Sequence, residues 1–528
     1  SNGTFTMDNV EATGSLLLGS QAGEDGTFTM SNVSTGGLLE VGNRLGGSNG
    51  SFTMKNVATT GPLKVGSEAG EDDGSFTMED VSVAKHLVVG PDAGRSNGNV
   101  QISGASVSDT VAVAEKAGRL GTFAMNNVSS DTLVVGDSAG YNGSFTMEDV
   151  SATQSLLIGT SAGANHGTVE MTDVSAGTNL EVGDSAAKDA GELDMDTVTV
   201  TKGSLELGDA IATSLAVSDD PGTATLDHVT VGDSVSVGNQ AGYGGTFRMT
   251  DLDVGDTLLI GNSAGRSGGT FTMSDVAADS GVSIGDDAGR DGSFDMSTVD
   301  VAAGDLEIGN NAGSINGTFT MNDVTLNGGN LEIGEYAGSD PTWSSKGGTF
   351  TAGNLNVTGD LIVEQEAGSQ EGSFTFTNGT VSELTVGDAV GGDAGDFEVS
   401  SVTIGDTAFV GNYVAVADGN VDLSDITVGD TLTIGSSIAE TNGSFDLVDS
   451  TIGDGLTVGS FAANEGDALF EDNTISDGDF TFKSDAVLNG GSLTIRENDV
   501  KNGDLSITFP GLGTIFCEYN TVSGINDC

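Results

Sequence analysis

The chain has 528 residues, of which 83 are Gly, 5 are Pro and 36% are hydrophobic. This composition is too apolar and regular for a disordered chain and too rich in Gly for a helical one, so it favours a β architecture with many tight turns. The 16 basic and 78 acidic residues give a formal net charge of −62, which repels nucleic-acid phosphates and anionic membrane surfaces. Nucleic acid is therefore not an expected partner.

Membrane insertion is not expected either, because no stretch approaches the roughly 20 consecutive apolar residues of a membrane span. The first residues, SNGTFTMDNV, lack the basic segment and apolar run of a secretory signal. The chain is therefore expected to be a mature or trimmed form.

One motif, GTFTM in its clearest form, recurs along the whole chain. Its glycine marks 22 units with a usual spacing of 22 to 25 residues, which begin at Gly3, Gly26 and Gly50 and end with Gly466, Gly491 and Gly513. Units of this length bury their apolar faces by stacking on one another. The sequence predicts an all-β fold, a single long parallel β-helix with three short strands per coil. Its regular repeats cover 1–465, and 466–528 form irregular C-terminal coils and a cap.

The first strand of each unit follows the pattern G-S/T-F-x-M. Alternation sends Phe and Met to one side of this strand and Thr, Ser or charged residues to the other. All 12 Met occupy one register, from Met7 to Met321, and Phe residues such as Phe28 and Phe145 form a second row. These rows are predicted to be the core, stacked like on like.

Two corners are expected to separate the strands of a coil. Asn and Asp tolerate a left-handed backbone, and they recur just beyond the Met position. The residues are Asn9, Asn32, Asn56, Asp80, Asn127, Asp149, Asp173, Asp196, Asp251, Asp275 and Asp323. Glycines after the last strand, such as Gly19, Gly42, Gly136 and Gly261, are expected to supply the second corner.

The unit length, the inward rows and the Asn corner together resemble the right-handed parallel β-helix of the pectin-lyase-like superfamily, and the repetitive β-solenoids of surface and adhesin-type proteins. The resemblance covers almost the whole chain. It implies coils with three strands and an Asn ladder at one corner, and it identifies an architecture rather than an activity.

Two units are longer than the others, Gly191 to Gly222 and Gly317 to Gly348. The second contains Trp343, the single Trp of the chain. Long loops on a regular scaffold often carry function, so a contact role and a tolerated insertion both stay open for this loop.

The candidate site is a row of carboxylates. The outward position of the first strand is Glu398, Asp422 and Asp446 in three successive units, with Asp396 beside them, and Glu170 with Asp194 form a smaller version. Like charges about 4.8 Å apart must be protonated, screened or bridged by a cation. The row is therefore a candidate cation patch, and no cofactor other than Ca²⁺ is expected; a solvated acidic face and a glycosidase-like pair stay open.

Catalytic machinery is otherwise not expected, because His86, His166 and His228 lie in different units without a Ser or Cys signature beside them. The chain is therefore predicted not to be an enzyme, with a polysaccharide lyase or glycoside hydrolase as the alternative.

A different surface suggests ice binding as a further alternative. The outward pairs Thr4/Thr6, Thr27/Thr29, Ser51/Thr53 and Ser75/Thr77 form a two-column hydroxyl array that resembles the T-x-T faces of β-solenoid antifreeze proteins. Asn99/Gln101 interrupt the array, as do Glu170, Asp194, Arg248 and Asp295 further along the chain. Thr and Ser are also ordinary solvent-facing strand residues.

Two features suggest an extracellular location. Cys517 and Cys528 are predicted to form a disulfide that fastens the last coil, which requires an oxidising compartment; two free thiols are the other possibility. Asn-x-Ser/Thr sequons in the loop entering the first strand would accept glycans in a eukaryotic secreted protein. These sequons include Asn2, Asn49, Asn142, Asn316 and Asn442.

The expected function is a non-catalytic extracellular structural or adhesive rod of a cell surface, fibre or matrix, on the order of 100 Å long. The first alternative is a carbohydrate-active or carbohydrate-binding β-helix, and the second is an ice-binding protein. Expected partners are other copies of the chain, other surface or fibre proteins, or carbohydrate. Another segment or copy is expected to cover the N-terminal strand, whose edge has no capping unit before it, and so to extend the chain into filaments.

Overall fold

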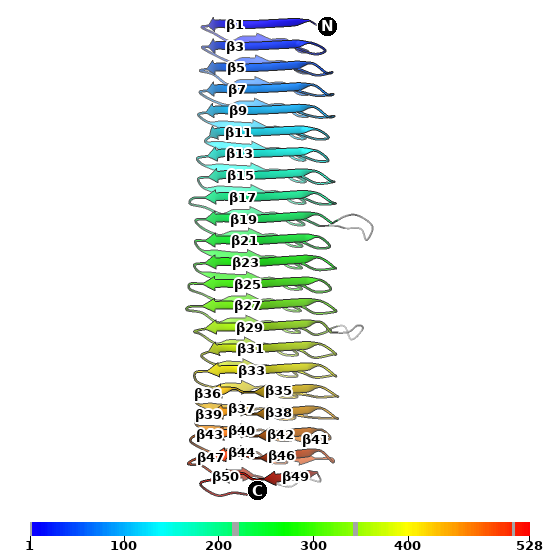
Figure 1. Cartoon of the computed structure of the whole chain (residues 1–528), viewed down its shortest axis with the longest axis vertical. Helices are drawn as coiled ribbons and strands as arrows, with labels where there is room; N and C mark the ends of the chain where they lie inside the picture. Colours follow the sequence, from blue (N-terminus) through cyan, green and yellow to red (C-terminus); the bar gives the residue numbers. More distant parts are fainter. Residues whose placement is uncertain (1–2, 214–220, 342–346, 509–512, 528) are drawn as a thin grey trace. The chain divides into compact units, whose positions relative to one another are not determined.

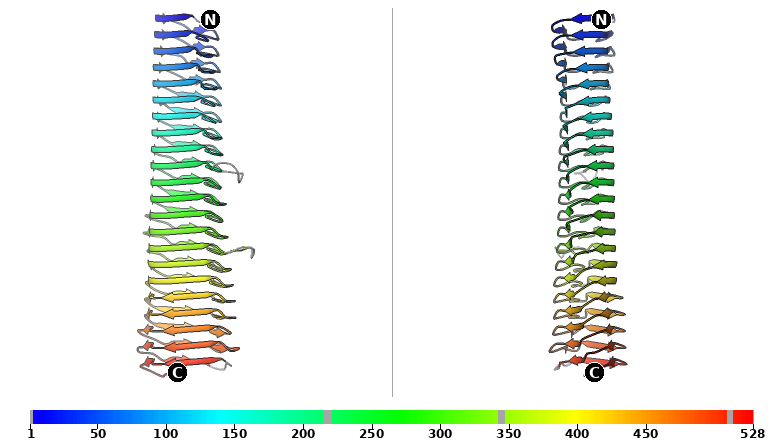
Figure 2. Two further views of the ribbon diagram at one scale, coloured as in Figure 1. Left: turned by 45° about the vertical axis from the view of Figure 1, so that its right-hand side comes forward. Right: turned by 90° about the vertical axis from the view of Figure 1, so that its left-hand side faces the viewer.

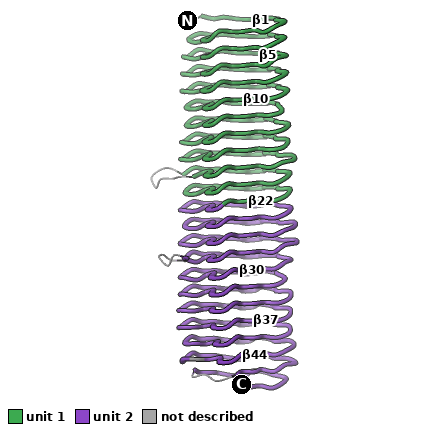
Figure 3. Tube along the Cα trace, turned by 180° about the vertical axis from the view of Figure 1, so that it is seen from behind, with its two compact units in different colours: residues 1–261 green, residues 262–528 purple. Residues whose placement is uncertain are grey.

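The computed structural model describes residues 3–213, 221–341, 347–508 and 513–527. Within these ranges the chain forms strands and turns and no helix. The predicted fold class is confirmed: the chain is an all-β parallel β-solenoid of about 21 coils with three strands per coil. The coils belong to two compact units, Ser1–Gly261 and Asn262–Cys528, shown in different colours in Figure 3.

In the first unit each coil has one long strand and one short strand (Figure 1). A bend divides each long strand into two straight segments, so that three extended segments make up a coil. The long strands are β1 (Thr4–Ala12), β3 (Thr27–Thr35), β5 (Ser51–Thr59), β7 (Ser75–Val83), β9 (Asn99–Val107), β11 (Thr122–Ser130), β13 (Ser144–Ala152), β15 (Thr168–Ala176), β17 (Glu192–Val200), β19 (Thr223–Val231) and β21 (Thr246–Val254). The short strands are β2 (Leu16–Leu18), β4 (Leu39–Val41), β6 (Leu63–Val65), β8 (Leu87–Val89), β10 (Thr110–Val113), β12 (Thr132–Val135), β14 (Ser155–Ile158), β16 (Asn179–Val182), β18 (Leu205–Leu207), β20 (Val235–Val237) and β22 (Thr257–Ile260).

The second unit begins with the same alternation. Its long strands are β23 (Thr270–Ala278), β25 (Ser293–Val301), β27 (Thr318–Leu326), β29 (Thr349–Val357), β31 (Ser373–Val381) and β33 (Asp396–Ile404). Its short strands are β24 (Gly281–Ile284), β26 (Leu306–Ile308), β28 (Leu331–Ile333), β30 (Leu361–Val363), β32 (Leu384–Val386) and β34 (Ala408–Val410).

From Asn420 onward the long strand is divided into two shorter ones, so three separate strands per coil become visible. They are β35 (Asn420–Ser424), β36 (Thr427–Val428), β37 (Thr431–Ile434), β38 (Ser444–Val448), β39 (Thr451–Ile452), β40 (Gly455–Val458), β41 (Ala463–Asn464), β42 (Asp467–Glu471), β43 (Thr474–Ile475), β44 (Phe480–Phe482), β45 (Val487–Leu488), β46 (Ser492–Arg496), β47 (Asp499–Val500), β48 (Leu505–Ile507), β49 (Thr514–Glu518) and β50 (Thr521–Val522).

Successive coils stack on one another within each unit (Figure 2), and the pairing of their strands places like residues on like. Phe28 pairs with Phe52 and Met30 with Met54 between the parallel strands β3 and β5. The Phe28 and Phe52 rings are stacked with centroids 4.7 Å apart, and all four side chains are buried. The predicted Phe and Met rows are therefore the core. Burying one such side chain contributes about 1.5–3 kcal/mol to folding.

The Asn/Asp corner has the backbone that its residue types favour. Asn32 and Asp80 have φ values of 52° and 54°, in the left-handed region, and they bend the long strand within each coil. The prediction is confirmed for the Asn and Asp residues named above except Asp196, which was wrong. Asp196 lies one position earlier, on the straight part of β17, and the bend falls on Thr197, whose φ is 55°.

The glycines after the short strands are required for a different reason from the one predicted. Gly42 and Gly136 do not have a positive φ, but a Cβ at either residue would lie 2.6 Å from a backbone nitrogen of the preceding coil, that of Ser20 or Glu115 respectively. Close approach of two coils therefore excludes a side chain. The positive-φ glycines belong to the next loop, as at Gly94, where φ is 73°.

The Asn ladder implied by the resemblance is present at the corner in an exposed form, where the Asn56 amide donates to Asn32 Oδ1 at 3.2 Å. A buried ladder lies one position later. In the last coils the residue after the corner is Asn, and Asn473 and Asn498 are each only 1% exposed. The Asn498 amide accepts from the Asn473 amide nitrogen at 3.0 Å and donates to Asn520 Oδ1 at 3.0 Å. A buried amide ladder thus joins the last three coils.

Candidate functional site

The predicted carboxylate row is stacked as expected. Glu398 of β33 pairs with Asp422 of β35, and Asp422 pairs with Asp446 of β38. The three side chains are half-buried, because neighbouring coils lie directly above and below each of them. Asp396 pairs with Asn420, so this second column loses its charge in the next coil.

Burial sets the electrostatics of this row. The pKa of Asp422 is raised by burial and by the Glu398 charge, against a hydrogen bond from Ser424 that lowers it. The pKa of Asp446 is raised by burial and then by the charges of Asp422, Asp467 and Glu471. Such a row favours a bound proton or a nearby cation over full ionisation.

The row does not form a compact ligand set. Among the described residues it does not bring three carboxylate oxygens within 4.8 Å of one another. Cation binding at Glu398, Asp422 and Asp446 stays a prediction. The smaller pair, Glu170 of β15 and Asp194 of β17, is also in register. The pKa of Asp194 is raised by burial and then by the charges of Asp196 and Asp227.

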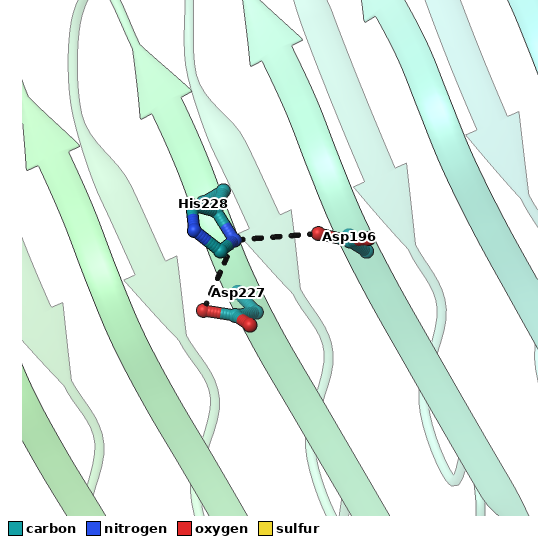
Figure 4. Close-up of side chains that lie close together, drawn as sticks. All are labelled: Asp196, Asp227 and His228. Atoms are coloured by element: carbon teal, nitrogen blue, oxygen red, sulfur yellow. Dashed lines mark ion pairs between the residues drawn. The ribbon is translucent and has the colours of Figure 1, made fainter.

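A second cluster of titratable side chains lies beside Asp194. Asp196, Asp227 and His228 place one potential ligand atom each within 4.8 Å of the other two (Figure 4). His228 Nδ1 lies 3.4 Å from Asp196 Oδ1 and 3.3 Å from Asp227 Oδ1. On the other side of the ring, Nε2 lies 3.5 Å from Asp251 Oδ2. Carboxylates from three coils therefore surround one imidazole.

The register of three strands produces this cluster. Asp196 of β17 is directly opposite Asp227 of β19, and His228 follows Asp227 at the bend, with a φ of 51°. Asp251 is at the bend of β21, the next coil. The sequence analysis missed the cluster because it placed Asp196 at the bend. Aligning Asp196 with Asp227, across the long unit Gly191 to Gly222, would have revealed the cluster in the sequence.

Two shallow hollows lie on the outward faces. The first, of about 560 Å³, lies over β11 and β13, where the small side chain of Ala124 leaves room between Gln101, Thr146 and Glu170. The second, of about 410 Å³, belongs to the second unit and is lined by Asp286, Glu307, Glu332 and Glu364. Both hollows could hold a polar chain or hydrated cations, and neither is enclosed.

The hydroxyl array is in register over four coils. Thr6, Thr29, Thr53 and Thr77 form one column, and the residues two positions earlier form the other. The next coil places Gln101 opposite Thr77, which ends the column as predicted.

The sequons and cysteines are placed as follows. Asn49, Asn142, Asn316 and Asn442 are exposed at turn positions with positive φ, whereas Asn2 lies outside the described residues. Cys517 of β49 is not a free thiol, and Cys528 lies outside the described residues, so their pairing stays a prediction. Trp343 also lies outside them, so the contact role of its loop stays a prediction.

Comparison with protein-family models, with curated proteins and with solved structures found no match to this chain. In the described part of the chain, no helix has the length and apolarity to cross a membrane.

Proposed function

We propose that the chain is a non-catalytic structural or adhesive repeat protein of an extracellular surface, fibre or matrix. The observation that carries this proposal is the in-register stacking of nearly identical coils. Between β3 and β5 alone, eight residue pairs are matched, and five of them are identical: one Phe, one Met, one Val and two Thr pairs. Such stacking makes stability roughly a sum of equal coil-to-coil contacts, which suits a stiff spacer.

The outward surface supports a multivalent contact. Each outward strand position recurs once per coil, about 4.8 Å from its equivalents, so a side chain in one coil is offered again in the next. Thr29 and Thr53 are one example, and Glu307 and Glu332 are another. Weak binding at one position can add up over many positions when a partner reaches several of them at once.

The exposed sequons support an extracellular location, since Asn49, Asn142, Asn316 and Asn442 are accessible at turns. The predicted disulfide at Cys517 agrees with the same compartment. The net charge of −62 keeps such a surface soluble and attracts cations to it.

A carbohydrate-active protein is the second candidate, and the half-buried carboxylate row favours it. A carboxyl group whose pKa burial has raised, beside a second carboxylate, is the arrangement that glycosidases use. Asp422 and Glu398 have this relation.

One experiment separates these candidates. The chain is incubated with acidic and neutral polysaccharides, and both reducing ends and bound protein are measured. The structural proposal predicts no release of reducing ends, with or without Asp422→Asn. Cleavage that Asp422→Asn abolishes, and that the exposed control Asp406→Asn preserves, would make the chain an enzyme.

A further inference from the structure

We propose that Asp196, Asp227 and His228 form a binding site for a divalent transition-metal ion of the Zn²⁺ class. This inference goes beyond the structural role proposed above and does not depend on it. The site is distinct from the row at Glu398, Asp422 and Asp446, which lies in the other unit.

The separations of the ligand atoms fit a single small ion. Zn–N and Zn–O bonds of about 2.0–2.1 Å in a tetrahedral site place neighbouring ligand atoms about 3.3–3.4 Å apart. His228 Nδ1 is 3.4 Å from Asp196 Oδ1 and 3.3 Å from Asp227 Oδ1. The Asp196 and Asp227 ligand atoms lie within 4.8 Å of each other, so rotation of these exposed carboxylates would bring all three atoms to one ion.

The negative charge around His228 also favours the binding of a cation. In the described part of the chain, Asp196, Asp227 and Asp251 form ion pairs with His228 and with no Lys or Arg. Asp196 of β17 and Asp227 of β19 are directly opposite each other, so their like charges repel. A divalent ion between them would offset this repulsion.

The ligand types select the class of ion. Imidazole suits Zn²⁺, Cu²⁺ and Ni²⁺, whereas Ca²⁺ and Mg²⁺ take oxygen ligands and Mg²⁺ keeps several waters. Two carboxylates and one imidazole complete three positions and leave the fourth to water. The side chains are 47%, 38% and 58% exposed for Asp196, Asp227 and His228, so the site is open to solvent.

A bound ion would fasten adjacent coils. Asp196 belongs to β17, and Asp227 and His228 belong to β19, so coordination links the first strand of the long unit Gly191 to Gly222 to the first strand of the next unit. Metal binding to the folded form alone stabilises it by mass action. The ion would act here as a structural staple.

The test is calorimetric titration of the whole chain with Zn²⁺ in an excess of Mg²⁺, which occupies the general acidic surface. The proposal predicts one Zn²⁺ site that His228→Asn and Asp227→Asn each weaken at least tenfold. Asn suits the left-handed backbone at residue 228, so the fold should be retained. His166→Asn is the matched control, because His166 is also exposed with a positive φ, of 64°, and forms no ion pair among the described side chains. It should leave the titration unchanged.

Hydrogen exchange gives a second measurement. Zn²⁺ should slow exchange of the amides of β17 and β19 in the wild-type chain and in His166→Asn, but not in His228→Asn. A titration that is the same in His228→Asn as in the wild type would overturn the proposal. So would the absence of Zn²⁺ binding in excess Mg²⁺, which would leave His228 as a proton-dependent ion-pair partner only.

Discussion

At the scale of the residue, the inward rows carry most of the stability. Phe145 lies between Phe123, whose ring centroid is 5.3 Å away, and Val169 of the following coil. It is fully buried, whereas its neighbour Thr146 points outward between Ala124 and Glu170. Each coil therefore presents one side of its strand to the core and the other to solvent.

We expect Phe145→Ala to lower the free energy of unfolding by about 3–5 kcal/mol, because it removes a large buried side chain and leaves a cavity. Thr146→Ala should change it little. Chemical denaturation of both variants checks this difference. Equal losses for the two variants would contradict the assignment of inward and outward positions.

The half-buried carboxylates give a residue-scale prediction with a defined sign. Burial raises the pKa of Asp446 above its ordinary value of 3.8, so the folded protein holds this proton more tightly than the unfolded chain. The resulting stabilisation is present below about pH 3.8 and is lost as the pH rises through the raised pKa.

Asp446→Asn removes this ionisation. We expect the variant to have a higher denaturation midpoint than the wild type at pH 7, and the same midpoint at pH 3. Asp253→Asn removes one charge from an exposed strand position and should show no such pH-dependent gain. A gain for Asp446→Asn that persists unchanged at pH 3 would show that ionisation is not its cause.

At the scale of the element, the last three coils differ from the others by their buried amides. Asn498 Nδ2 lies 2.9 Å from the Phe470 carbonyl oxygen and 3.0 Å from Asn520 Oδ1, while Asn498 Oδ1 accepts from Asn473. Where the earlier coils bury Val at this corner, these coils bury a hydrogen-bonded chain of amides. Such a ladder holds successive coils at one register.

We expect Asn498→Ala to destabilise the C-terminal coils by about 1–3 kcal/mol, because it leaves buried backbone and amide groups without partners. Hydrogen exchange of β42, β46 and β49 measures the effect locally. Asn356→Ala, at an exposed position of β29, is the control and should leave these amides protected. Unchanged protection in Asn498→Ala would contradict a stabilising role for the ladder.

The repeat period was enough to predict the strands, the register and the core. Phe28 on Phe52 follows from equal spacing, and Asn32 at the bend follows from the residue types that tolerate a positive φ. Contacts between coils were not predictable from one coil. Gly42 is required because the backbone of the preceding coil leaves no room for a side chain. The ladder that contains Asn473 is recognised only when three coils are compared, and its signal in the sequence was the recurring Asn in DNT, END and YNT of the last units.

The candidate site was predicted in part for the same reason. The row of Glu398 and Asp422 lies in units of equal length, so counting placed the carboxylates opposite each other. The cluster at His228 was missed because Asp196 was assigned to the bend, where Thr197 lies, instead of to the position opposite Asp227. Only the pairing of β17 with β19 brings the two together.

At the scale of the whole molecule, the net charge of −62 and the in-register coils describe a protein whose acidic outward surface repeats from coil to coil, as at Glu307 and Glu332. Both units are built on the same coil. A structural or adhesive function depends on the repeated surface of the whole chain. A catalytic function would depend only on the row of Glu398, Asp422 and Asp446.

Immunogold electron microscopy of the native source material, with antibody raised against this chain, tests the structural proposal most directly. The proposal predicts gold particles along an extracellular surface, fibre or matrix, in numbers that exceed those on pre-immune controls. Label confined to the cell interior, with none on the surface or in the surrounding matrix, would contradict it.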